Sequence, residues 1–123
     1  GIADSVPVQR RYRLRSSTEI TRVRQSGESY AHPLLVLIIK AGESPISRFA
    51  VAAGRSIGNA VHRNRAKRLL RAALREVIAD IEPGYQGLVI ARKPLLQASS
   101  QQAGAALKKL LKQAGIGPSN KHG

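Results

Sequence analysis

The chain has 123 residues, enough for one domain with a single hydrophobic core and too few for two. Its hydrophobic fraction of 42% is typical of a folded domain rather than of a disordered basic tail. Lys and Arg number 21 against 7 Asp and Glu, which gives a formal net charge of +14 at pH 7. This charge exceeds what solubility requires and indicates a polyanionic partner: nucleic acid, an anionic membrane or an acidic protein.

Several classes of partner and cofactor are disfavoured. The longest apolar run, residues 34–39, is strand-sized and far shorter than a membrane span of about 20 residues. No secretory signal pattern is present, so we expect a cytoplasmic protein without a membrane partner. The absence of cysteine removes disulfides, zinc knuckles and thiol nucleophiles, and His32, His62 and His122 lack metal-ligand spacing. We therefore expect no metal or cofactor bound by the protein, and nucleic acid as the partner.

The first 55 residues predict an arm, a short helix and two strands. Residues 1–9 are polar and aperiodic, and we expect a flexible arm that leads into the basic stretch RRYRLR. The segment SSTEITRVRQSG predicts a short helix, capped by Ser17 and ended by Gly27. Residues 33–40 and 48–55 predict strands separated by the turn sequence AGESP, the second being the antiparallel return of the first.

The remaining residues predict a long helix, a third strand and a last helix. Apolar residues recur at intervals of three and four from about 59 to 79, which predicts a helix with one side packed on the sheet and Asn59 as its N-cap. Residues 88–94 predict a strand and 97–115 a helix. Because both faces of the strands are apolar, we expect an α/β (α+β) sandwich, a small central sheet packed by helices. It forms one domain over residues 10–115, followed by a flexible tail at 116–123.

The most informative stretch is IGNAVHRNRAKRLLRAAL, residues 57–74. Six Lys and Arg lie between residues 63 and 75, and no acidic residue interrupts them before Glu76. At about 100° per residue they fall mainly opposite the apolar residues. A run of charge is usually only a solvated face, but these like charges repel one another and no Glu at i,i+4 compensates them. The pattern therefore favours a helix face that contacts nucleic acid.

RNA is a better candidate than DNA for this helix. The chain has four aromatic residues, Tyr12, Tyr30, Phe49 and Tyr85, which is too few for a platform that stacks successive bases. No helix-turn-helix pair is evident either. Recognition of the backbone and shape of a folded RNA suits the arginines best.

The GNAV turn followed by RNR, with RFAVAAGR before it and LVIARKP after it, resembles the protein subunit of bacterial ribonuclease P. The resemblance covers about residues 13–111. It implies a ribonucleoprotein endoribonuclease that removes the 5′ leader from precursor tRNA, with hydrolysis performed by the RNA subunit and its Mg²⁺ ions. The protein would bind RNase P RNA and precursor tRNA as a monomer in a 1:1 complex, and would supply no catalytic residue.

The resemblance implies two sites and an unusual connection. One site is a cleft between the first helix and the sheet, where Ile20, Arg24, Val36 and Ile38 would contact the single-stranded leader. Family members commonly carry aromatic residues at positions 20, 24 and 38, and ordinary core packing explains the three aliphatic residues equally well. The connection is a left-handed βαβ crossover through the long helix, against the usual right-handed rule. The other site is an RNA-binding surface made of Arg63, Asn64, Arg65, Lys67, Arg68, Arg71, Arg55, Asn59, and Arg13 and Arg15 of the basic arm.

Two functions from other classes stay open on the sequence alone. A structural RNA-binding protein, such as a ribosomal component, can share this kind of α/β sandwich. An autonomous protein nuclease needs general-base or metal-binding residues, and a lone His62 without a partner at defined spacing is a poor candidate for that role.

Overall fold

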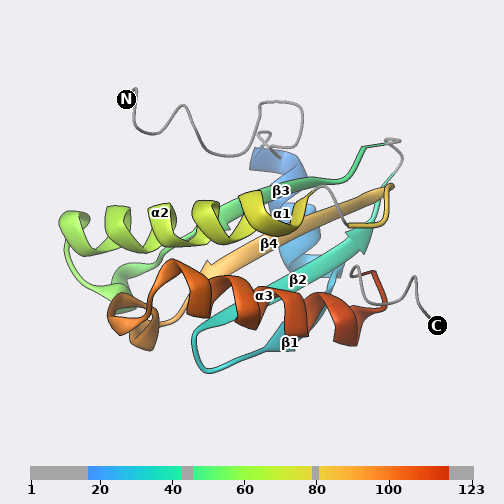
Figure 1. Ribbon diagram of the computed structural model, residues 1–123. Coiled ribbons are helices and arrows are strands. Elements are labelled where there is room, and N and C mark those ends of the chain that lie inside the picture. Colours follow the sequence, from blue (N-terminus) through green and yellow to red (C-terminus); the bar gives the residue numbers. More distant parts are fainter. Residues whose placement is uncertain (1–16, 43–45, 79–80, 117–123) are drawn as a thin grey trace.

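The computed structural model describes residues 17–42, 46–78 and 81–116, and shows a mixed sheet with helices on both faces (Figure 1). Helices α2 and α3 cover one face and α1 the other. This arrangement confirms the predicted α+β sandwich. The elements are α1 (Ser17–Ser26), β1 (Glu28–Ala31), β2 (Leu35–Ala41), β3 (Arg48–Ala52), η3 (Arg55–Ile57), α2 (Ala60–Val77), β4 (Tyr85–Ala91), η5 (Lys93–Gln97) and α3 (Ser100–Ala114), where η marks a short 3₁₀ helix.

The order of the strands corrects one prediction. The sheet runs β1-β2-β4-β3, with β3 parallel to β4 and the other two pairs antiparallel. The predicted antiparallel pairing of β3 with β2 is wrong, because β4 lies between them. Two apolar strands separated by a turn sequence resemble a hairpin, and the sequence between them does not reveal that a later strand will insert. The sequence also missed β1, a short and largely exposed edge strand.

The connection from β3 through α2 to β4 is left-handed, as the resemblance implied. In Figure 1, β3 lies above β4, both strands run from right to left, and α2 lies in front of the sheet. Viewed along the direction of the two strands, the path from β3 through α2 to β4 is therefore anticlockwise, which is the left-handed sense. Most such crossovers are right-handed, so periodicity alone could not have predicted this one.

The two faces of the sheet bury unequal amounts of apolar surface. The main core lies under α2 and α3 and contains fully buried leucines such as Leu37, Leu70 and Leu107. The smaller core lies under α1 and contains Val23, Ile38 and Leu88. Because side chains alternate between faces along a strand, β2, β3 and β4 each have residues in both cores.

Helix ends follow the predicted capping chemistry with one exception. Asn59 is the N-cap of α2 as predicted, and Ser99 caps α3 in a capping box with Gln102. Ser17 is the first residue of α1 rather than its cap, and its carbonyl accepts a hydrogen bond from the Thr21 hydroxyl one turn later. The predicted arm at 1–9 lies outside the described residues, as do residues 117–123 of the predicted tail. Ile116, the first residue of the predicted tail, is buried in the main core.

Replacing Gly87 with Ala is expected to lower the free energy of unfolding by about 1–3 kcal/mol, because the added methyl overpacks the core. An ideal Cβ at Gly87 would lie 2.2 Å from Cε2 of Phe49. Urea unfolding measures the change. The matched control is Gly54→Ala, where nothing lies within 4 Å of the added Cβ, and its stability should stay within about 0.5 kcal/mol of the wild type. Equal losses in both variants would contradict the close packing of Phe49 on Gly87.

Candidate nucleic-acid interface

The turn before α2 fixes where this helix begins. Gly58 has φ of +133°, a conformation that side chains rarely adopt, and an added Cβ would lie 2.9 Å from Nδ1 of His62. Asn59 follows in an extended conformation, and its side-chain oxygen accepts a hydrogen bond of 3.0 Å from the backbone N–H of His62. The GN pair therefore ends the preceding segment and satisfies one of the free amides of the first turn.

The buried stripe of α2 determines which side chains face outward. Ala66, Leu70, Ala73, Leu74 and Val77 are buried against the sheet and α3. The predicted RNA-contacting residues of this helix occupy the remaining surface, where Asn64, Arg65 and Arg68 are exposed and the others half-buried. We call this the basic surface of α2; it consists of Arg63, Asn64, Arg65, Lys67, Arg68 and Arg71.

Part of the basic surface is hollowed. Asn64, Lys67, Arg68 and Arg71 line an open pocket of about 340 Å³. Their spacing of three, four and seven residues places them on one side of the helix. Three cationic groups and one amide thus face a single depression, which suits the oxygens of a phosphate backbone.

The other predicted contact residues have separate positions. Arg55 is exposed in η3, just before the Gly58 turn. Asn59 is exposed, but its side-chain oxygen is already used as the helix cap. Arg13 and Arg15 lie outside the described residues.

The sequence reasoning missed two cations close to the start of α2. Arg92 and Lys93 follow β4 and are exposed; Arg92 precedes and Lys93 begins the segment η5, which packs against η3 and α2. Because β3 and β4 are parallel, their carboxyl ends meet at the same edge of the sheet, next to Arg55. The parallel pairing was the missing information, since an isolated RK dipeptide after a strand has no location of its own. Arg92 Nη1 donates a hydrogen bond of 3.3 Å to the carbonyl of His32.

The residues predicted to contact the leader gather on the other face of the sheet. Ile20 and Val36 are half-buried beside the small core, Ile38 is only 7% exposed within it, and Arg24 is exposed on α1. The burial of Ile38 favours the core interpretation for that residue. The half-buried side chains around this core form what we call the aliphatic patch, which consists of Ile20, Val36, Ala50, Ala52 and Ile90.

Two kinds of site find no support in the described part of the chain. No group of three or more His, Cys, Asp or Glu side chains there could hold a metal ion. No helix among residues 17–42, 46–78 and 81–116 is both long and apolar enough to cross a membrane.

Comparison with known proteins identifies the family. The family model for ribonuclease P matches residues 8–115. The chain belongs to the ribonuclease P protein family. A relative named ribonuclease P protein component from Herpetosiphon aurantiacus is 39% identical over 107 residues, which cover 87% of each protein. Membership of this family confirms the resemblance seen in the GNAV and RNR motifs.

Solved structures of the ribonuclease P family share the fold. The RNase P protein of Staphylococcus aureus matches with a TM-score of 0.72 and 26% identity, covering 85% of this chain and 96% of that one. The RNase P protein of Thermotoga maritima matches with a TM-score of 0.72 and 27% identity, covering 82% and 96%. The likeness thus extends over nearly all of the described residues.

Asn59→Ala is expected to lower the free energy of unfolding by about 1 kcal/mol, because the amide of His62 loses its acceptor. Asn59→Ser keeps an oxygen in the capping position and should retain most of that stability. Thermal unfolding of both variants measures the difference. Asn64→Ala serves as the matched control, since Asn64 is exposed within the helix, where Ala has the higher propensity. If Asn59→Ala were as stable as the wild type, the side chain would not act as the cap.

Proposed function

We propose that the chain is the protein subunit of ribonuclease P, which binds RNase P RNA and the 5′ leader of precursor tRNA and so assists 5′ maturation of tRNA in the cytoplasm. The basic surface of α2 is the observation that carries this proposal. It presents three cations and an amide around one hollow, on a helix that the main core holds rigidly. Family membership supplies the identity of the RNA partner.

Contacts to phosphate explain how such a surface assists a catalytic RNA. Arg side chains donate paired hydrogen bonds to phosphate oxygens, and Lys67 adds a compact charge. Each contact replaces a condensed counterion, so the protein lowers the concentration of salt or Mg²⁺ that the RNA needs to remain folded and bound to its substrate. Hydrolysis belongs to the RNA subunit, which binds the Mg²⁺ ions, and no side chain of the protein acts as acid, base or nucleophile.

The leader binds, on this proposal, to the face of the sheet that α1 covers, opposite the face that carries the main core. The aliphatic patch offers partly exposed surface between α1 and the sheet, and all of its side chains are aliphatic. Stacking of a base on an aromatic side chain contributes about 1–3 kcal/mol, and the patch cannot supply that contact. Leader binding here therefore depends on shape, van der Waals contact and nearby charge.

We propose one protein per RNA subunit.

Reconstitution tests the proposal directly. Precursor tRNA is incubated at low Mg²⁺ with a compatible bacterial RNase P RNA alone, with the protein alone and with both. Release of the 5′ leader is expected only from the mixture, because the protein supplies cations and the RNA supplies the chemistry. Cleavage by the protein alone would establish an autonomous nuclease instead. Tight RNA binding without any gain in cleavage would favour a structural RNA-binding protein.

Arg68→Ala is expected to weaken binding to RNase P RNA and to reduce the slope of log K against log salt concentration by about 0.7–0.9, the value of one phosphate contact. Filter binding across a salt series measures both quantities. Lys112→Ala on α3 is the matched control, because it removes one exposed cation outside the basic surface of α2. An unchanged slope for Arg68→Ala, or an equal change in both variants, would argue against phosphate contact at Arg68.

A further inference from the structure

A second pocket lies on the α1 face of the sheet, away from the basic surface of α2. It encloses about 270 Å³ and is lined by residues of α1 and of three strands or their ends. We call it the polar pocket; its lining residues are Glu19, Arg22, Lys40, Ala41, Gly42, Arg48 and Gln86.

The polar pocket continues the surface of the aliphatic patch. Side chains two residues apart on a strand share one face, and the strand registers therefore arrange the α1 face in rows. The first two rows are apolar and the third is polar. In the order β2, β4, β3, the rows are Val36, Ile90 and Ala52; Ile38, Leu88 and Ala50; and Lys40, Gln86 and Arg48.

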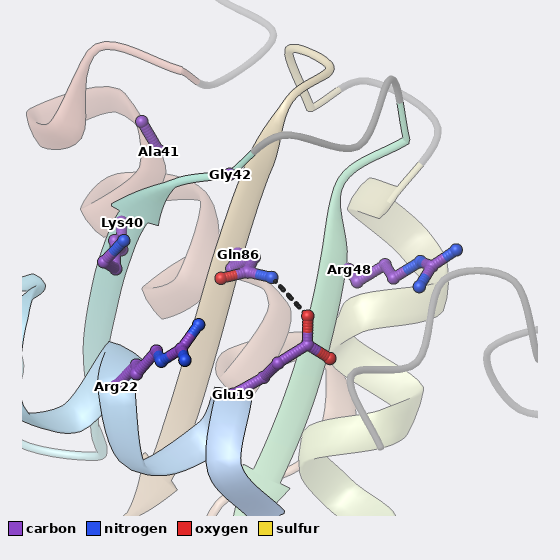
Figure 2. Close-up of a pocket in the computed structure, with 7 residues that line it drawn as sticks. All are labelled: Glu19, Arg22, Lys40, Ala41, Gly42, Arg48 and Gln86. Carbon is purple, nitrogen blue, oxygen red and sulfur yellow. Dashed lines mark hydrogen bonds between the residues drawn. The ribbon is translucent and has the colours of Figure 1, made fainter. Parts of the chain in front are cut away.

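A hydrogen bond between distant residues supports the polar pocket. Gln86 Nε2 donates to Glu19 Oε2 at 3.0 Å, which joins the first turn of α1 to β4. Figure 2 shows Glu19 directed at Gln86, with Arg22 and Lys40 on one side of that pair and Arg48 extending away on the other. The three cations thus lie on the two sides of this hydrogen-bonded pair.

The charge of the polar pocket favours an anion. Among the described residues that line it, three are basic and one is acidic, and that one carboxylate already accepts a hydrogen bond. Arg22 is exposed and Lys40 is half-buried, and phosphate oxygens are strong acceptors for guanidinium and ammonium groups.

We propose that the polar pocket binds the phosphodiester backbone of the single-stranded leader, upstream of the nucleotides that cross the aliphatic patch. This inference rests on the proposed function and adds a second contact region to the leader. Arg22 and Lys40 hold one phosphate beside Gln86. The leader is the favoured occupant over the RNA subunit, because the pocket adjoins the aliphatic patch whereas the basic surface of α2 belongs to a helix on the opposite face of the sheet.

The polar pocket also accounts for leader binding without aromatic side chains. Aliphatic contacts alone give a single strand little affinity. Phosphate contacts add affinity that does not depend on base identity. Binding should then depend on leader length, since a short leader ends before it reaches the third row. It should also depend on salt, by a slope of about 0.7 per contact for a single strand.

The test uses the reconstituted holoenzyme and precursor tRNAs with leaders of increasing length. For the wild type, affinity is expected to rise with leader length and then reach a plateau. In the double variant Arg22→Ala, Lys40→Ala, the final rise should disappear, with affinity for the longest leader lowered on the order of tenfold. The salt slope for that leader should fall by about 0.7, for the one phosphate that the two cations hold together. Arg48 is left unchanged because its side chain extends away from the Glu19–Gln86 pair.

Controls separate this inference from the proposed function. The variant Lys108→Ala, Lys109→Ala removes two exposed cations from α3 and should keep the wild-type length dependence. Equal weakening of short and long leaders in the pocket variant, or no weakening at all, would overturn the leader assignment. Weaker binding of RNase P RNA itself, measured without precursor, would assign the pocket to the RNA subunit and also overturn it. Wild-type cleavage that fails altogether would instead contradict the proposed function.

Discussion

The packing of one amphipathic helix on the sheet is the constraint on which the rest of the molecule depends. Like charges spaced three or four residues apart destabilise a helix by about 0.2–0.5 kcal/mol per pair, and α2 carries several of them. Burial of a Leu or Val side chain contributes about 1.5–3 kcal/mol, and Leu70, Leu74 and Val77 are all buried. Core packing therefore outweighs the repulsion and holds the cations in a fixed array. A basic peptide without this core would not present them in the same geometry.

The parallel pairing of β3 and β4 arranges the surroundings of that helix. Both strands end at the edge where α2 begins, so Arg55 and the Arg92–Lys93 pair come close to its first turn. The Gly58 conformation and the Asn59 cap then set the direction in which the helix leaves this edge. The RNR residues thus obtain their location from the topology as much as from their own sequence.

The sequence predicted what depends on neighbours along the chain and missed what depends on neighbours in space. The period of α2, its N-cap and its charged side are local properties, and the structure agrees with each of them. The pairing of β3 with β4 is not local, because β4 follows a helix of 18 residues. The hydrogen bond from Gln86 to Glu19 joins residues 67 positions apart, so the polar pocket could not be derived from spacing. The residues predicted to contact the leader came from the family resemblance. The alternation of Val36 and Ile38 in β2 did not show which residues of β3 and β4 lie beside them.

On the proposed function, the sheet divides the work of RNA binding between two chemically different surfaces. On the α2 side the cations stand on an exposed helix, a geometry suited to a folded RNA that stays bound as a structural partner. On the α1 side an aliphatic surface leads into a pocket with cations around a fixed amide, a geometry suited to a flexible strand that must bind and leave at each turnover. Because contacts to phosphate and aliphatic surface do not distinguish bases, a leader held in this way can vary in sequence while still reaching both regions. The cost of that tolerance is sensitivity to salt, since screening weakens charge contacts far more than it weakens stacking.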